Sequence, residues 1–370
     1  MVRPKIFVTG ATGKTGVSVV TALRALDYPV RAVVRRRDAR SAHLEFLGAE
    51  IAEADIYDYE NLAAAMRGTQ RAYYCPPLGP YLLQSATAFA VAAREARIES
   101  VVNISQWTAS PSHPAIATRQ HWLADELFKL LPDIAHTIVA PGYFADNYLR
   151  LIDFAAFLGV FPVLTGSSRN APPSNEDIAR VSVAALIAPE RHAGKRYRPT
   201  GPALLSAYDM AAIIAKVLGH RVVALPMPFW LFQRAARLQG VDPFLLASLR
   251  YYVRDHVAGA FAVDAPTDDV YETTGRPAED FETTARRYAA MPFAQPTLSN
   301  RVRTLLNFAL VPFVPGYDFE RRSRVQLEPL PMHATQCMDS ERWHGEHDPH
   351  DQRATNGATF ELAAVGESSA

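Results

Sequence analysis

Three evenly spaced glycines near the N-terminus are the residues whose pattern points most directly to chemistry. Gly10, Gly13 and Gly16 follow the short apolar run Ile6-Phe7-Val8 and precede a helix-like segment. Such glycines allow a sharp turn off a strand, a close approach of pyrophosphate to the backbone, and tight packing of the helix, whose N–H groups then face the phosphates. The predicted dinucleotide-binding residues are Gly10, Ala11, Thr12, Gly13, Lys14, Thr15 and Gly16; the alternative is a tight turn without a ligand.

A run of arginines follows the next apolar strand, 30–34. Arg35-Arg36-Arg37 begins about where dinucleotide-binding proteins place the residue that contacts the adenosine ribose. A guanidinium binds a 2′-phosphate through paired, charge-assisted hydrogen bonds, whereas a carboxylate would repel it. The pattern therefore favours NADP(H), with Arg35 as the first candidate, Arg36 as the second, and Lys14 adding charge to the same phosphate. The alternative is that the arginines form a solvated loop.

Alternating strands and helices are expected to position these residues. The apolar patterns predict six strands and four helices before Gly142, with no internal repeat. This alternation is typical of an α/β fold with a doubly wound parallel sheet (Rossmann) and right-handed crossovers. The strands are expected at about 6–8, 30–34, 49–53, 72–75, 100–104 and 135–139, and the helices at about 17–26, 59–67, 80–96 and 118–131.

The rhythm of the sequence changes beyond Gly142, and this change suggests a division of the chain. We predict that 1–150 form an NADP-binding Rossmann domain and 151–292 a smaller α/β substrate-side lobe that sends elements back to the sheet. An apolar and basic extension over 293–330 is expected to pack on that lobe, or to contact a partner or a membrane surface. From 331 the composition is polar, and we expect disorder.

Composition limits the classes of partner. Of 370 residues 49% are hydrophobic, and 38 Lys and Arg balance 38 Asp and Glu, so no global basic field attracts nucleic acid. The two cysteines, Cys75 and Cys337, imply no disulfide framework. We find no signal peptide and no apolar run long enough for a bilayer, and expect a cytoplasmic protein without a membrane partner. No metal site is predicted, because the spacing of the late histidines fits none: His333, His344, His347 and His350.

Longer motifs resemble the NmrA-like branch of the atypical short-chain dehydrogenases/reductases, over about residues 4–292. The shared pieces are TGATGKTG (9–16), VVRRRD (33–38), EADIYD (53–58), VVNIS (101–105), QHWLADELF (120–128), TIVAPGYFADNYL (137–149) and TTGRPAEDFETTARRYA (273–289). The resemblance implies NADP(H) or NAD(H) binding. Some such proteins reduce quinones or dyes, and others are redox-sensing regulators.

The resemblance also implies further contacts with the cofactor. Asp55 and Ile56 are expected to flank the adenine, with the Asp55 carboxylate accepting from its amino group. The predicted contacts with the ribose, pyrophosphate and nicotinamide are Cys75, Pro76, Pro77, Asn103, Ser105, His121, Pro141, Gly142 and Tyr143. The sequence supplies no base beside Cys75, so we expect a packed or cofactor-adjacent thiol and not a nucleophile.

The usual catalytic set of the superfamily, a Ser and a Tyr-x-x-x-Lys, is incomplete. Ser105 fits the Ser position, but 106–131 contains no Tyr-x-x-x-Lys, and with His121 at the lysine position the tyrosine position is Ala117. The predicted catalytic residues are Ser105, His121 and Tyr143, with Tyr148 as an alternative phenol. His121 is expected to contact the nicotinamide ribose or supply a proton, or to be a satisfied supporting residue.

Two functions remain open from the sequence. One is an NADP(H)-dependent reductase of quinone-like or conjugated carbonyl small molecules. The other is a non-catalytic NADP(H)-binding redox sensor of the NmrA type with a protein partner. A pocket for a flat acceptor would favour the first, and the candidate lining is Phe144, Phe154, Phe157, Trp230 and Phe232, although aromatic residues at helical spacing are more often plain core.

Overall fold

The computed structural model of this chain describes residues 3–77, 79–319, 321 and 335–347. Within these ranges a seven-stranded sheet runs in the order β3-β2-β1-β4-β5-β6-β9, and every neighbouring pair is parallel. The strands are β1 (Ile6–Val8), β2 (Val30–Val34), β3 (Glu50–Glu53), β4 (Arg71–Tyr74), β5 (Ser100–Ile104), β6 (Ala135–Val139) and β9 (Arg196–Tyr197). The predicted doubly wound parallel sheet is confirmed.

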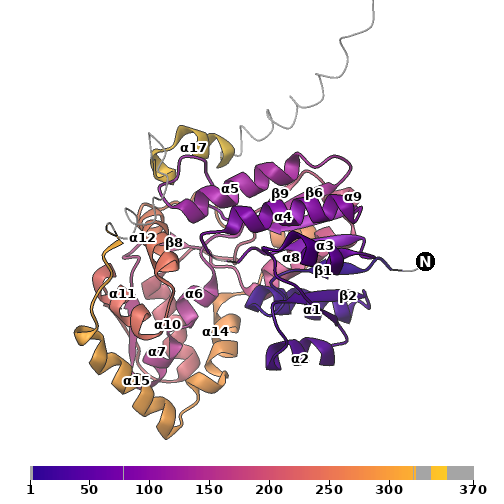
Figure 1. Cartoon of the computed structure of the whole chain (residues 1–370). Helices are drawn as coiled ribbons and strands as arrows, with labels where there is room; N and C mark the ends of the chain where they lie inside the picture. The colour runs from indigo at the N-terminus through magenta and orange to yellow at the C-terminus, as the bar shows by residue number, and fades with distance from the viewer. Residues whose placement is uncertain (1–2, 78, 320, 322–334, 348–370) are drawn as a thin grey trace, which may run out of the picture.

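Helices cover both faces of this sheet (Figure 1). One face packs against α1 (Lys14–Ala25), α2 (Ala39–Phe46) and α8 (Asn175–Ile187), and the other against α3 (Tyr59–Met66), α4 (Leu82–Glu95) and α5 (Ile116–Lys129). The apolar strands supply both cores because a parallel sheet is buried on its two faces. The order in which the strands are added to the sheet reverses between β1 and β4. Doubly wound sheets bind their ligands at this switch point.

Helix α2 is an element of the first lobe that the sequence patterns missed. It begins after Asp38, whose carboxylate accepts from the backbone N–H of Arg40, while Ser41 completes a reciprocal capping box. Only Ser41 and Leu44 of this short helix are buried, so its apolar stripe is too weak to be read as a helix. The capping residues were the available signal.

A second lobe carries the later helices (Figure 1). Its elements are α6 (Ala145–Leu149), α7 (Ile152–Leu158), β7 (Val160–Val163), β8 (Arg169–Asn170), β10 (Leu205–Ser206), α10 (Ala207–Leu218), β11 (Val223–Pro226), α11 (Phe229–Leu238), α12 (Pro243–Val257), α14 (Phe281–Ala289), η1 (Pro292–Ala294), α15 (Leu298–Leu310) and η2 (Val311–Phe313). The chain returns to the first lobe with α8, α9 (Pro189–His192), β9 and α13 (Asp269–Thr274), so the lobes interleave in sequence. The division at 150 stays a prediction.

The expected disorder from 331 does not hold for 335–347, where η3 (Cys337–Asp339) and α17 (Glu341–His347) form. Trp343 is fully buried, and its indole N–H donates to the Trp107 carbonyl at 3.3 Å. Burying a Trp and a Cys outweighs the polar composition that suggested disorder. The rest of the predicted tail, 331–334 and 348–370, lies outside the described residues.

No helix in the described ranges combines the length and apolarity needed to cross a bilayer.

Candidate functional site

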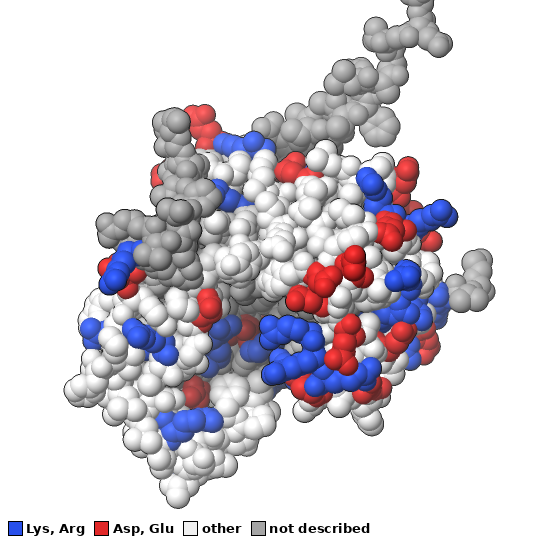
Figure 2. Space-filling view, in the orientation of Figure 1, with Lys and Arg blue, Asp and Glu red and all other residues white. Residues whose placement is uncertain are grey.

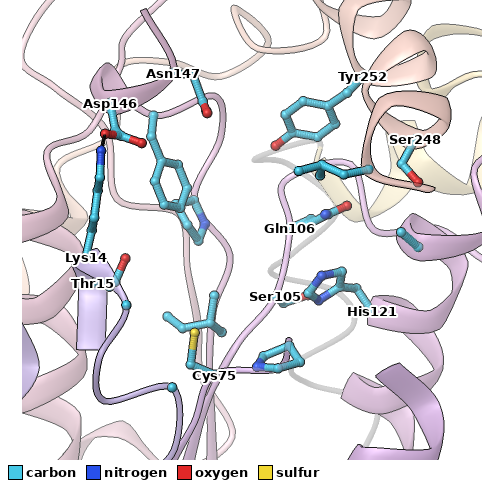
Figure 3. Close-up of a pocket in the computed structure, with 18 of the residues that line it drawn as sticks. Lys14, Thr15, Cys75, Ser105, Gln106, His121, Asp146, Asn147, Ser248 and Tyr252 are labelled. Atoms are coloured by element: carbon cyan, nitrogen blue, oxygen red, sulfur yellow. Dashed lines mark hydrogen bonds and ion pairs between the residues drawn. The ribbon is translucent and has the colours of Figure 1, made fainter. Parts of the chain in front are cut away.

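A cleft of about 440 Å³ opens between the two lobes, at the carboxyl ends of β1, β4, β5 and β6. Figure 2 shows a hollow between the lobes with Lys and Arg side chains gathered beside it. The glycine turn and α6 form one wall, and the end of β5 together with α5 and α12 forms the other (Figure 3). The predicted site residues that line it are Gly10, Gly13, Lys14, Thr15, Gly16, Cys75, Pro76, Ser105, His121, Pro141, Gly142 and Tyr143.

The glycine turn has the geometry that its spacing predicted. Gly10 has a positive φ of 61°, and a Cβ on Gly16 would lie 2.1 Å from the Gly10 carbonyl oxygen, so glycine is required at both positions. Helix α1 begins at Lys14 with neither an acidic residue in its first turn nor a side-chain cap. The first-turn N–H groups are therefore open to an anion in the cleft.

The arginine run divides into one bound and two open side chains. Arg37 forms ion pairs with Glu45 and Glu53. Arg35 and Arg36 are exposed, and neither has an ion-pair or hydrogen-bond partner among the residues that the structure describes. Two guanidinium groups at the end of β2 are thus open to a phosphate, which fits the predicted contact with a 2′-phosphate.

Lys14 points across the cleft toward α6. Its ammonium group contacts the Asp146 carboxylate of α6, and the Tyr288 hydroxyl at 3.3 Å (Figure 3). Arg150 donates to the other Asp146 oxygen at 2.9 Å. Burial alone would raise the pKa of Asp146, but the bonds from Lys14 and Tyr288 and the charge of Arg150 bring it below its ordinary value. The carboxylate therefore joins the glycine turn to the second lobe.

Ser105 is held by a buried carboxylate. Its Oγ donates to Asp125 Oδ2 at 2.6 Å, and Asp125 also accepts from Asn103 Nδ2 at 2.8 Å and Arg196 Nη1 at 2.9 Å. Asp125 is completely buried on α5, and these three donors offset the cost of burying its charge. Asn103 does not line the cleft but supports Ser105 through Asp125.

His121 lies in the cleft wall beside Ser105 in Figure 3. Burial lowers the pKa of the imidazole to about 4, against a raising influence of Asp125. Its Nε2 has no hydrogen-bond partner in the described part of the chain, while its ring bonds to the Ile104 backbone. A neutral ring with an open nitrogen is suited to a hydrogen bond with a ligand, and less suited to donating a proton at neutral pH.

The two candidate phenols separate in the structure. Tyr143 lines the cleft, and burial raises the pKa of its hydroxyl to about 12. Tyr148 lies outside the cleft, with its hydroxyl 2.6 Å from His256 Nε2. Tyr143 therefore keeps its proton at neutral pH in a position that a cleft ligand can reach, whereas Tyr148 is engaged within the second lobe.

The thiol of Cys75 lies at the foot of the cleft (Figure 3). Burial raises its pKa to about 11, so the thiol is protonated at neutral pH.

The remaining predicted contacts do not line the cleft. Asp55 is exposed at the end of β3 and accepts from the Tyr57 N–H at 3.0 Å. The others outside the lining are Ala11, Thr12, Arg35, Arg36, Ile56, Pro77 and Asn103.

Helix α12 supplies a wall that the sequence patterns did not reveal. Its cleft-facing side chains follow helical spacing, and in Figure 3 Tyr252 directs its hydroxyl toward the cleft, with Ser248 on the same helix. An apolar helical stripe of this kind is indistinguishable from core in the sequence. The wall residues are Phe244, Leu245, Ser248, Leu249 and Tyr252, and other lining residues that were missed are Gln106, Thr118, Asp146, Asn147, Arg150 and Asn175.

Of the five aromatic residues considered for the pocket, only Phe144 lines this cleft. Phe154 is buried, and its ring centroid lies 6.5 Å from that of Phe308. It is therefore a core residue, which was the alternative interpretation from the sequence. Trp230 is 54% exposed. Phe232 lines a smaller neighbouring cavity, and Phe157 lines neither. Residues at helical spacing face whichever surface their own helix packs against, and sequence alone does not indicate it.

One group of possible metal ligands occurs among the described residues, formed by His113, Asp255 and Cys337, all buried. His113 Nδ1 accepts from the Ala115 N–H at 3.0 Å, so Nε2 carries the proton and donates to Asp255 at 2.8 Å. A protonated Nε2 is not a ligand atom, and the group is a hydrogen-bonded pair. His347, one of the late histidines, instead stacks on Trp343 with ring centroids 4.0 Å apart.

The sheet order and the glycine turn define a Rossmann-type NAD(P)-binding protein. The chain belongs to the NmrA-like family, whose model matches residues 3–242, and the predicted membership is confirmed. Helix α12 and everything after it lie beyond the matched residues.

Comparison with known proteins gives relatives that this chain matches over nearly their whole length. The chain is 29% identical over 290 residues to an NAD(P)H azoreductase of Xenophilus azovorans, covering 77% of this chain and 98% of that protein. It superimposes with a TM-score of 0.64 and 22% identity on an NADPH-dependent quinone oxidoreductase of Escherichia coli solved with NADPH, over 76% of this chain and 99% of the other.

The same fold occurs in a regulator. NmrA, a negative transcriptional regulator solved with NADP, matches with a TM-score of 0.62 and 16% identity, over 77% of this chain and 95% of the other. The predicted cofactor, NADP(H), is bound in these two solved structures, and the azoreductase is named for NAD(P)H.

Proposed function

We propose that the protein is an NADP(H)-dependent reductase of quinone-like or conjugated carbonyl small molecules. The observation that carries this proposal is the cleft itself, which continues from the glycine turn to a largely apolar wall on α12. A site that only bound the nucleotide would need the first part and not the second. The azoreductase and quinone oxidoreductase relatives support the same class of chemistry.

The chain's residues fit the nucleotide from one end to the other. The exposed Arg35 and Arg36 receive the 2′-phosphate, and the uncapped start of α1 receives the pyrophosphate. The open Nε2 of His121 accepts a hydrogen bond from a ribose hydroxyl. Asp55 follows the carboxyl end of β3, where the adenine is expected. When bound, the nicotinamide supplies the hydride.

The acceptor lies between Tyr143 and the α12 wall. Apolar side chains of that wall exclude water and hold a flat, conjugated ring. Tyr143 and Tyr252 remain protonated, because burial raises the pKa of Tyr143 to about 12 and that of Tyr252 well above its ordinary value. Each phenol can therefore donate a hydrogen bond to a carbonyl oxygen that gains charge during reduction.

Steady-state oxidation of NADPH against a panel of quinones, azo dyes and conjugated ketones tests the proposal. We expect turnover with at least one flat acceptor and none with saturated ketones. The absence of Tyr-x-x-x-Lys favours the second candidate, a non-catalytic redox sensor of the NmrA type. Calorimetric NADPH binding without turnover across the panel would leave only the sensor.

A further inference from the structure

Helix α15 has its polarity reversed relative to an ordinary surface helix. Its buried residues are the polar Asn300 and Thr304. Asn300 Nδ2 donates to the carbonyl of Pro292 at 2.8 Å, and Thr304 Oγ1 donates to Asp153 at 3.2 Å. These hydrogen bonds attach the helix to α7 and η1 through its polar side, which leaves its apolar side facing outward.

The outward side is strongly apolar. Leu298 is 78% exposed, and Leu305 and Leu306 are 54% and 55% exposed. At 3.6 residues per turn these leucines and Val302 fall on one side of the helix. With η2 they form a surface that we call the α15 face, made of Leu298, Val302, Leu305, Leu306, Leu310 and Phe313. A contiguous apolar surface of this kind marks an interaction site.

Helix α11 extends this face with an aromatic ring. Arg234 stacks over the ring of Trp230 at 5.1 Å and donates to the Pro312 carbonyl at 2.9 Å, next to Phe313. Trp230 is 54% exposed and Phe313 is 82% exposed. In Figure 1 α15 lies at the outer end of the second lobe, and in Figure 2 that end is largely uncharged, with a few basic side chains and some acidic atoms.

The charged residues of α15, η2 and α11 are all arginines. By helical spacing Arg301 and Arg303 lie on opposite flanks of the leucine stripe, and both are exposed. Neither 219–241 nor 291–316 contains Asp or Glu. Arginines on both sides of an apolar stripe can keep their charges at the level of lipid headgroups while the leucines enter the acyl boundary.

A second copy of the chain suits this face less well. In a symmetric contact through α15 the flanking arginines of the two copies would approach one another, with no Asp or Glu of the same segments to pair with them. Asp153 lies beneath the helix and accepts from Thr304. An anionic bilayer suits this face better, because its headgroups can pair with the arginines and its acyl boundary can take up the leucines.

We propose that the α15 face docks the protein on an anionic lipid bilayer as a peripheral contact. The inference rests on the reversed polarity of α15 together with its two flanking arginines, and is independent of the reductase proposal. It takes up the contact with a membrane surface that the sequence left as an alternative for 293–330.

Co-sedimentation of the full chain with vesicles tests this docking. Vesicles of phosphatidylcholine containing phosphatidylglycerol should bind the protein, and vesicles of phosphatidylcholine alone should bind it much less. Each arginine contributes about fivefold to binding, so removing both, in Arg301→Ala with Arg303→Ala, should weaken binding about 25-fold. Leu305→Ser with Leu306→Ser should weaken it by more than about tenfold. Added salt should also release the protein.

The matched control is Phe46→Ser, which removes an 87% exposed side chain from α2 on the other lobe. It should leave vesicle binding unchanged. Circular dichroism and thermal unfolding report whether each variant is folded. The proposal fails if the wild type does not prefer anionic vesicles, or if Phe46→Ser weakens binding as much as the α15 variants. It also fails if sedimentation velocity shows a dimer that Leu305→Ser with Leu306→Ser dissociates, because the face is then a self-interface.

Discussion

The two ends of the cleft are built in different ways. At the glycine turn the contacts offered to a ligand are backbone N–H groups, placed by Gly10 and Gly16 within one short stretch of chain. At α12 they are side chains of a helix that follows the turn by more than two hundred residues. A backbone site tolerates little change at its glycines, whereas a side-chain wall can change its shape residue by residue without disturbing the fold. We infer that the first end fixes the cofactor and the second selects the acceptor.

Breaking the backbone end should have the largest effect. Gly16→Ala places a Cβ 2.1 Å from the Gly10 carbonyl oxygen, so the turn must move. We expect calorimetry to detect no NADPH binding, and the free energy of unfolding to fall by about 2–3 kcal/mol. In the control Gly68→Ala the new Cβ meets open space, and only the left-handed backbone, at about 1 kcal/mol, opposes it. Equal nucleotide affinities in the two variants would contradict the role of the turn.

The arginine run provides a second test of the cofactor end of the cleft. Arg35→Ala should weaken NADPH binding by about 1.5–3 kcal/mol, roughly tenfold to a hundredfold, and leave NADH binding nearly unchanged. Arg37→Ala is the matched control, because Arg37 is paired with Glu45 and Glu53. Its ratio of NADPH to NADH affinity should equal that of the wild type. If both coenzymes lose affinity equally in Arg35→Ala, the 2′-phosphate contact is wrong.

His121 lies between the two ends and can be followed by pH. Its pKa is about 4 in the folded protein against an ordinary value of 6.5, so the unfolded chain takes up a proton first as the pH falls. The stabilising contribution is complete above 6.5 and is lost progressively toward 4. Between pH 7 and pH 5 it should decrease by about 2 kcal/mol.

Urea unfolding of wild type and His121→Gln at both pH values measures this contribution. The variant should lose about 2 kcal/mol less than the wild type on acidification, since the other buried histidines are common to both proteins. Identical losses would show that the His121 ring is not held neutral by burial.

The smallest effect is expected at the α12 wall. Tyr252→Phe removes one hydroxyl from the cleft, and should lower kcat/KM for a quinone acceptor roughly twofold to tenfold, which corresponds to about 0.5–1.5 kcal/mol of lost transition-state stabilisation. The affinity for NADPH should not change. Tyr251→Phe alters the neighbouring residue, which does not line the cleft, and should leave both constants unchanged. A loss of NADPH affinity in Tyr252→Phe would contradict the separation of the two ends.

The sequence by itself determined the sheet and the backbone part of the site. The strands 30–34, 100–104 and 135–139 were predicted with the boundaries that the structure shows, and the glycine turn was placed at the end of β1. These features depend on local properties: apolar runs that a parallel sheet buries on both faces, and glycines where no Cβ fits.

Only the tertiary structure decided the partner of Lys14, the α12 wall and the packing of 335–347. Lys14 meets Asp146 because α6 lies across the cleft, and Trp343 is buried because the 105–115 segment offers it a surface. Such contacts join residues more than a hundred positions apart, and a helical stripe carries no mark of which surface it will face. Local chemistry fixes where a backbone can bind a phosphate, while long-range packing fixes which side chains meet the acceptor.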